Sequence, residues 1–434
     1  MSYICDNISA AKNGHLLFAG RDTVELAEKY GTPLYLMDEQ RIRYNCRVYK
    51  KAFSDCFSES SLPLFASKAF CIKWIYSILA EEGFGTDVVS PGEIYTAYKA
   101  GFNLQNAWFH SNDKTDSDIR FAMDCGVGYF VIESEDEAFA VNSAASERGI
   151  VQNVLIRVTP GIDTHTYAAV NTGLVDSKFG VAIETGQADS LLAKVLTLKS
   201  LNLVGFHCHV GSSIFAEDVF ERSAEIMIRF IADSYHKYGF RAQQLNLGGG
   251  YGVRYTKSDP YLDISKKISS VASAVKTSCE KYGIPVPDIF LEPGRSIVAD
   301  AGMTLYTAGS MKRIPGYKNY VSVDGGMTDN PRYALYRSRY TCYDASKMNE
   351  EDMIDCDIVG RCCESGDVIQ PGVLMPKSVS RGDIIAVCTT GAYNYSMASN
   401  YNRVPRPAVL LLGKDKEELI VRRESLDDLI RLDV

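Results

Sequence analysis

Several residues that could do chemistry follow short apolar segments at separate places in the chain. Lys68 ends the apolar run of FASKAF, His209 lies in HCHVGSS, and Glu292 lies in LEPGR. A lysine partly removed from water would have a lowered pKa and an amine able to attack a carbonyl. Taken singly, the three residues have simpler explanations: a solvated lysine, a packed histidine and one member of an ion pair.

The segment LNLGGGYG is a candidate anion-binding loop. Gly248, Gly249 and Gly250 follow an apolar run, and successive glycines let backbone N–H groups approach an anion with no Cβ in the way. The alternative is a tight turn without a ligand. Because EPGR follows the next apolar run, we favour a phosphate held by the three glycines together with Gly294 and Arg295.

These candidates together indicate one kind of site. A reactive lysine, a phosphate loop, a carboxylate for a heterocyclic nitrogen and an imidazole that can lie against the ring describe a pyridoxal phosphate site. His207 is an alternative to His209 for the imidazole, because two residues apart on a regular strand point the same way.

Strand-like segments alternate with helical patterns between residues 62 and 295. Stretches 71–82 and 216–238 have apolar residues at helical spacing. Eight alternations predict an α/β fold with a (β/α)8 TIM-like barrel, and an open doubly wound sheet is the alternative. The candidate residues would then share the face where barrel strands end. The predicted strands are 62–69, 85–90, 107–111, 128–133, 153–160, 203–211, 243–250 and 288–295.

The pattern changes after residue 296, where strand-like segments are separated by Gly, Pro and Asp turns. They predict a second, all-β domain. We therefore expect an N-terminal segment, 1–32, that docks on the β domain, a pyridoxal phosphate-binding barrel, 33–296, and a C-terminal β domain, 297–434. The strand-like segments are 303–311, 319–326, 383–390, 408–412 and 418–423.

Composition argues against several classes of function. Forty-six basic and 54 acidic residues give a formal net charge of −8 without a basic cluster, which argues against nucleic acid and anionic lipid as partners. No stretch approaches the ~18 uncharged apolar residues of a membrane helix, and Asp6 and Lys12 interrupt any secretory signal, so we expect a cytoplasmic protein. Twelve cysteines without regular spacing predict reduced thiols.

Ten stretches carry a resemblance that covers nearly the whole chain. They are YGTPLYLMD, FASKAF, GTDVVSPGEI, TGLVDSKFG, GFHCHVGSS, LNLGGGYG, LEPGRSIVADAG, VDGGMTDNPRYALY, CCESGDVI and GAYNYSMASNYNRVPRP. With them the chain resembles the barrel-type, fold type III pyridoxal phosphate-dependent decarboxylases, and among these the diaminopimelate decarboxylases. The resemblance implies pyridoxal 5'-phosphate as cofactor, an amino-acid substrate, no metal ion, and a homodimer with shared active sites.

The resemblance also implies roles for the residues that bind the cofactor. Lys68 is similar to the lysine that links covalently to the cofactor, His209 to the residue that stacks on its ring, and Glu292 to the partner of its pyridine nitrogen. The positions similar to the remaining cofactor-binding residues are Ser212, Gly248, Gly249, Gly250, Pro293, Gly294, Arg295 and Tyr393.

A second group of positions resembles the residues that handle the substrate. Cys363 is similar to the cysteine that returns a proton to the substrate carbon, and its spacing to Glu364 favours it over Cys362. Glu364 is similar to the carboxylate that receives the distal amino group. The positions similar to those that hold the distal carboxylate are Arg295, Arg332 and Tyr336, with Tyr393 also placed at the substrate.

The implied reaction is the decarboxylation of meso-2,6-diaminopimelate to L-lysine and CO2, the last step of lysine biosynthesis. Arg332 agrees with this substrate, because it supplies a cation for a second carboxylate where an amine-ended substrate would need an acidic residue. The alternatives are a decarboxylase of D-ornithine, D-lysine or arginine, an alanine-racemase-like enzyme, and an inactive binding homologue. Intact Lys68, His209, Glu292 and Cys363 argue against the last.

Overall fold

The computed structural model describes residues 3–162, 175–216 and 218–434. The chain divides into two compact units. The barrel unit comprises residues 45–252 and 262–294, and the terminal unit comprises residues 1–44, 253–261 and 295–434. The resembling stretch TGLVDSKFG begins with three residues, 172–174, that lie outside the described part of the chain.

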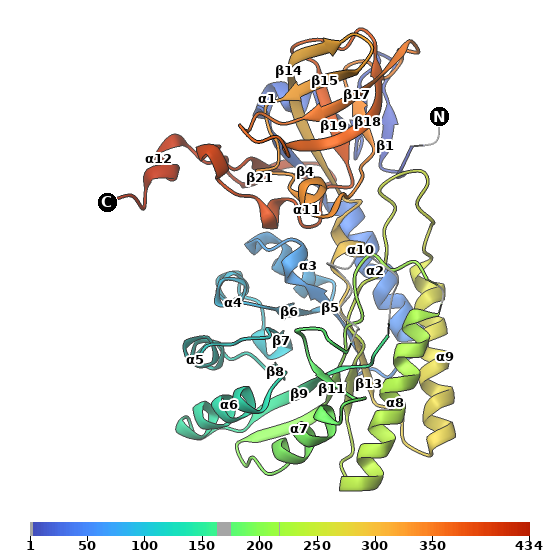
Figure 1. The fold of residues 1–434 in the computed structure, drawn as a ribbon, viewed down its shortest axis with the longest axis vertical. Coiled ribbons are helices and arrows are strands. Elements are labelled where there is room, and N and C mark those ends of the chain that lie inside the picture. The colour runs from blue at the N-terminus through green and yellow to red at the C-terminus, as the bar shows by residue number, and fades with distance from the viewer. Residues whose placement is uncertain (1–2, 163–174, 217) are drawn as a thin grey trace. The chain divides into compact units, whose positions relative to one another are not determined.

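The barrel unit contains a closed parallel barrel, as the sequence predicted (Figure 1). All eight predicted strands are present. The ring is closed by pairing at four positions between β8 (Tyr129–Ile132) and β9 (Gln152–Thr159), the strands at the two ends of the order given next. In order around the barrel the strands are β9 (Gln152–Thr159), β11 (Leu201–His207), β12 (Gln244–Asn246), β13 (Asp288–Leu291), β5 (Leu62–Ala66), β6 (Gly85–Val88), β7 (Ala107–Phe109) and β8 (Tyr129–Ile132).

Helices connect successive barrel strands and lie outside them (Figure 1). The strand β10 (Val181–Ala182) is an addition that pairs with β9. Side chains of alternating strand positions fill the interior, as a packed barrel requires; they include Leu64, Trp108, Val131, Leu155, Val204 and Phe290. The helices are α3 (Lys73–Glu81), α4 (Pro91–Lys99), α5 (Asp116–Asp124), α6 (Glu135–Glu147), α7 (Gln187–Val195), α8 (Val219–Tyr238) and α9 (Ile264–Tyr282).

The terminal unit is built around a mostly antiparallel sheet. Its continuous order is β18 (Val368–Pro376), β17 (Met353–Val359), β15 (Lys318–Val323), β14 (Gly302–Ile314), β4 (Leu34–Asp38), β20 (Ala408–Leu412) and β21 (Glu417–Val421). Strand β19 (Ile384–Cys388) pairs with both β14 and β16 (Cys342–Asp344). Apolar residues with a period of two form the core beneath β4, β14 and β20, namely Leu34, Leu36, Met303, Leu305, Leu410 and Leu412.

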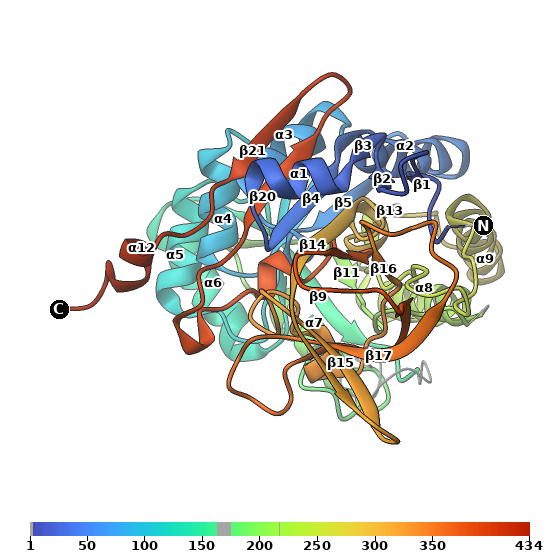
Figure 2. The ribbon, with the colours of Figure 1, turned by 90° about the horizontal axis from the view of Figure 1, so that it is seen from above.

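The start of the chain contributes a strand to this sheet. Strand β4 pairs antiparallel with β14 and parallel with β20 (Figure 2). From the sequence we predicted that the barrel domain begins at residue 33. In the structure, residues 33–44 and 253–261 belong to the terminal unit instead. The apolar run LYLMD is buried at every position. Its sequence is therefore equally compatible with a barrel strand and with a central strand of another sheet.

Within the described residues, no helix combines the length and apolarity needed to cross a membrane.

Candidate active site

Lys68 lies directly after the end of a barrel strand. Strand β5 stops at Ala66, and the short turn η1 (Ser67–Ala69) carries the lysine. Two contacts fix the turn: the Ser67 N–H donates to Asp87 Oδ1 at 3.2 Å, and the Ala66 N–H donates to the Pro293 carbonyl at 3.1 Å. The Lys68 side chain is exposed, because the lysine lies on a turn beyond the end of the strand. We had expected this side chain to be partly removed from water.

Two carboxylates, the buried Asp87 and the half-buried Glu93, lie close enough to Lys68 to interact with its charge. Burial raises the pKa of Asp87 to about 7, although the positive charge of Lys68 opposes the rise. Burial and the neighbouring Asp87 raise the pKa of Glu93 to about 7. Glu93 accepts a hydrogen bond from the Val89 N–H at 2.8 Å. The surroundings of Lys68 therefore include two carboxyl groups, those of Asp87 and Glu93, that change charge near neutral pH.

The glycine loop 248–250 folds back on the ends of two neighbouring strands. A Cβ at Gly249 would lie 2.0 Å from the Glu292 carbonyl oxygen, and Gly250 has a φ of +108°, so only glycine fits either position. The Gly248 N–H donates to Asn246 Oδ1 at 2.9 Å, and the Gly249 N–H donates to His209 Nδ1 at 3.2 Å. Two of the three N–H groups therefore donate within the protein, and the binding of an anion by this loop, with Gly250 as a donor, stays a prediction.

His209 and Ser212 lie on the loop that follows β11, beside the glycine loop. The Ile214 N–H donates to the Gly250 carbonyl at 2.9 Å, which ties the two loops together. Burial and the positive charge of Lys68 hold the pKa of His209 well below its usual range. A neutral, half-buried imidazole suits contact with the face of an aromatic ring.

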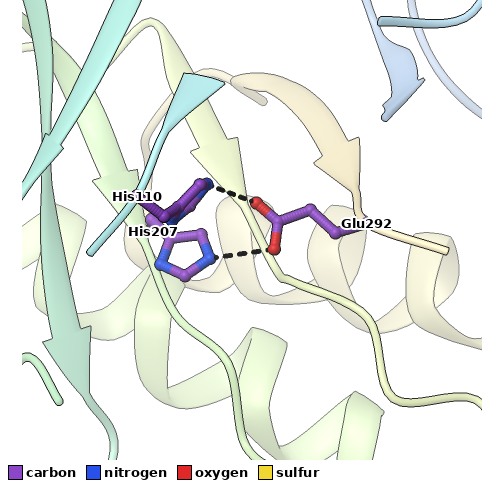
Figure 3. A group of neighbouring side chains, drawn as sticks. All are labelled: His110, His207 and Glu292. Atoms are coloured by element: carbon purple, nitrogen blue, oxygen red, sulfur yellow. Dashed lines mark hydrogen bonds and ion pairs between the residues drawn. The ribbon is translucent and has the colours of Figure 1, made fainter. Parts of the chain in front are cut away.

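Glu292 is a buried carboxylate held by three nitrogen atoms. Asn246 Nδ2 donates to Oε1 at 2.7 Å, His110 Nε2 lies 2.9 Å from Oε1, and His207 Nε2 lies 3.3 Å from Oε2 (Figure 3). Burial alone would raise the pKa of Glu292, but the two histidines hold it well below the usual range. Glu292 is thus an anion directly after the end of strand β13, next to the glycine loop.

In the terminal unit, Arg295 contacts both Tyr255 and Tyr393. Arg295 Nη1 donates to the Tyr255 hydroxyl at 2.7 Å, and the Arg295 guanidinium lies 4.6 Å from the centre of the Tyr393 ring. Tyr393 has a φ of +65°, a conformation that costs energy for a residue with a side chain and is held in place by its surroundings.

Arg332 belongs to the same cluster. It begins α11 (Arg332–Tyr336) and is 4% exposed. Its guanidinium donates to the Tyr340 hydroxyl at 2.7 Å and lies 4.8 Å from the centre of the Tyr255 ring. Burial would raise the pKa of Tyr255, but the two guanidiniums, with that of Arg295 first, bring it below the usual value. Two cations therefore converge on one phenol, which marks a place suited to an anion.

Tyr336, Cys363 and Glu364 lie outside that cluster of contacts. Tyr336 is half-buried, one turn after Arg332, while Cys363 and Glu364 are exposed in a turn. The Cys363 N–H donates to Asn402 Oδ1 at 2.8 Å. Asp367 holds the start of the turn by accepting the Cys362 N–H at 2.7 Å. Burial, assisted by Asp367, raises the pKa of the Cys362 thiol to about 11.

Several residues around these groups were not singled out from the sequence. Asp87, Glu93, His110 and Asn246 contact or influence the expected cofactor residues, and Tyr255 joins the two arginines. Two of them could have been found from their positions in the sequence. His110 and Asn246 lie near the ends of predicted strands, where polar residues follow an apolar run.

The residues of the barrel unit fit pyridoxal phosphate. The ionised Glu292 can accept a hydrogen bond from a protonated pyridine nitrogen, and the glycines let the loop pack directly against the backbone of Glu292 and Gly211. A lysine at a strand end can form the covalent link. Fold and site together define a barrel-type pyridoxal phosphate enzyme.

Comparison with known proteins gives the family. The family model described as "Pyridoxal-dependent decarboxylase, pyridoxal binding domain" matches residues 39–299, and the chain belongs to this family. The resemblance inferred from the sequence is confirmed, and with it the class of enzyme and the cofactor, pyridoxal phosphate.

Individual relatives match along nearly the whole chain. Diaminopimelate decarboxylase of Bacillus subtilis is 42% identical over 423 residues, which cover 98% of this chain and 96% of the relative. Diaminopimelate decarboxylase of Staphylococcus aureus is 41% identical over 419 residues, covering 96% and 97%. The structure of diaminopimelate decarboxylase from M. jannaschii with L-lysine superposes with a TM-score of 0.91 at 33% identity, covering 99% and 98%.

Proposed function

We propose that the protein decarboxylates meso-2,6-diaminopimelate to L-lysine and CO2. The observation that carries the proposal is the buried Arg332 guanidinium, hydrogen-bonded to a phenol and stacked near another. A substrate that ends in a carboxylate suits this cation, whereas an amine-ended substrate would be repelled. Relatives named for this activity, at 42% and 41% identity, support the same choice.

The residues divide the work of the reaction. Bound pyridoxal phosphate supplies the electron sink that makes loss of CO2 possible. Lys68 holds the cofactor, Glu292 keeps a proton on its ring nitrogen, and His209 supports the ring. We assign Ser212, Gly250, Pro293 and Gly294 to the phosphate, and Arg295 and Tyr393 keep the cofactor-binding roles that the resemblance implies; Gly248 and Gly249 shape the loop. The bond to the carboxylate breaks, its electron pair stays on carbon, and a proton replaces CO2.

The decisive experiment is release of CO2 by the purified protein. We expect rapid release from meso-diaminopimelate and far less from lysine, ornithine and arginine assayed at equal concentration. Preferential release from one of the other three amino acids would replace the proposed substrate, and no release from any of them would leave an inactive homologue.

Replacing Arg332 with alanine should weaken selection of the substrate. A hydrogen bond to a charged group contributes about 1.5–3 kcal/mol, so we expect kcat/KM for diaminopimelate to fall at least about tenfold, with unchanged cofactor absorbance. The exposed Arg339 supplies the control, because its alanine variant should behave as wild type. Equal kcat/KM for both variants would show that Arg332 does not bind substrate.

We propose Cys363 as the proton donor, with Glu364 receiving the distal amino group. Partial burial and Asp367 raise the pKa of the Cys362 thiol, which weakens it as an acid, while the Cys363 side chain is exposed. Because general acids contribute about 10²–10⁴-fold, Cys363→Ser should lower kcat about a hundredfold or more while the cofactor spectrum still responds to substrate. Cys362→Ser should stay close to wild type. The reverse result would transfer the role to Cys362.

We propose a homodimer in which the turn carrying Cys363 and Glu364 serves the barrel of the partner subunit. The exposure of both side chains leaves them available to a second copy, and a two-fold axis would create two equivalent sites. A cytoplasmic location completes the proposal, because all twelve cysteines are free thiols, as in reducing compartments.

A further inference from the structure

Glu292 is surrounded by more polar groups than a simple contact to a cofactor requires. His110 and His207 are fully enclosed, with side-chain exposures of 7% and 1%, and their rings meet edge to face at 4.6 Å between centres. They come from the ends of β7 and β11 and lie next to each other, each facing one oxygen of the carboxylate (Figure 3). Burying two imidazoles and a carboxylate together costs stability unless each is hydrogen-bonded, so the arrangement calls for a functional reason.

The contacts use most of the acceptor capacity of the carboxylate. A carboxylate offers about four lone-pair positions. Oε1 faces Asn246 at 2.7 Å and His110 at 2.9 Å, whereas Oε2 faces only His207, at 3.3 Å, among the described contacts. Oε2, which faces a single nitrogen among the described contacts, therefore has an acceptor position open.

The charge state of the group follows from its surroundings. Burial lowers the pKa of His110, and burial lowers the pKa of His207 to about 4, with Arg157 adding to both effects. Glu292 has its pKa held well below the usual range. At neutral pH the group is thus two neutral imidazoles, each with a single N–H, and one carboxylate.

We propose that His110 and His207 are positioning residues for Glu292: His207 donates its Nε2–H to Oε2, His110 places its Nε2 against Oε1, and together they keep the group ionised and leave an acceptor position of Oε2 for the pyridine nitrogen. The ring nitrogen then keeps its proton, which the electron sink needs. The inference rests on the proposed role of Glu292 and assigns two further residues to the cofactor site.

The same atoms could bind a metal ion, since the three residues offer ligand atoms within 4.8 Å of one another. The hydrogen-bond network argues against that use. The nitrogen atoms of His110 and His207 address different oxygens, and Asn246, which donates an N–H, occupies a further position on Oε1. A metal would leave that amide facing a ligand already committed to the ion.

The test uses holoenzyme loaded with cofactor carrying ¹⁵N in the ring, whose chemical shift reports the protonation of that nitrogen. Glutamine places an N–H close to the position of Nε2 of histidine, whereas leucine removes the donor. We expect His207→Leu and His110→Leu to move the signal toward the unprotonated value and to weaken cofactor binding at least about tenfold. His207→Gln and His110→Gln should restore both properties in large part.

Further variants separate the possible failures. Glu292→Gln must change the signal if Glu292 is the nitrogen's partner; an unchanged signal overturns both that role and the inference. A changed signal in Glu292→Gln together with wild-type shift and affinity in both leucine variants overturns the inference alone. His15→Leu removes a histidine–carboxylate contact in the terminal unit, 2.8 Å long, and should change neither property.

Misfolding of a variant and binding of a metal ion would each give a distinct result. If a leucine variant does not fold, the glutamine variants decide, because loss of ring protonation despite a retained N–H would contradict the proposal. A stoichiometric metal ion in the purified holoenzyme, removed by chelator with loss of cofactor, would replace it with a metal site.

Discussion

Lys68→Ala should yield a colourless protein whose decarboxylase activity is at least about a thousandfold lower, since removal of a covalent catalytic group causes losses of that size or more. The wild-type protein should be yellow, and treatment with borohydride should attach the cofactor permanently to the peptide that contains Lys68. Mass spectrometry of the digested protein identifies the peptide. The prediction follows from a lysine on the turn after β5, near the carboxylates of Asp87 and Glu93.

Lys73 provides the control for that experiment. It is an exposed lysine at the first position of α3, five residues further along the chain. Lys73→Ala should keep colour and activity, and no label should be found on Lys73 in the wild type. Recovery of the cofactor on a different lysine would refute the assignment of Lys68, and an active protein without pyridoxal phosphate would refute the chemistry.

Mixing two inactive variants should restore activity. Lys68→Ala and Cys363→Ala each leave every site of their own dimer incomplete if the two residues of a site come from different subunits. After equal mixing and random exchange, half of the dimers are mixed, and each has one intact site of two. About a quarter of wild-type activity should therefore return.

A double variant tests whether recovery depends on complementary sites. When Lys68→Ala/Cys363→Ala protein is mixed with either single variant, no dimer contains an intact site, so activity should stay at the level of the variants. Exchange is followed by native mass spectrometry with an isotope-labelled subunit. Complete exchange without recovery in the first mixture would show that Cys363 serves its own chain.

The barrel could be predicted because each of its elements has a local signal. Eight buried strands alternate with amphipathic helices, and the period of the apolar residues changes at each boundary. The membership of β4 could not be predicted in this way. Its partners β14 and β20 lie hundreds of residues away, and an apolar run of five residues does not specify which sheet it enters.

The site shows the same division between local and distant information. Lys68, His209 and Glu292 could be chosen because each follows an apolar strand and has a side chain suited to pyridoxal phosphate. The hydrogen bonding of Gly248 and Gly249 could not, because it depends on how the loop folds back against Asn246 and His209.

Strand β4 has consequences for how the protein is made on the ribosome. Its residues, Leu34–Asp38, are synthesised well before the two strands that flank it, which begin at Gly302 and Ala408. At about 5–20 residues per second, synthesis leaves β4 without its sheet partners for tens of seconds. The residues of the barrel unit are complete by Gly294, so this unit can form first, while a nascent chain displays an apolar strand that needs protection from aggregation. Completion of the sheet must await β20, which is synthesised more than a hundred residues after the last residue of the barrel unit.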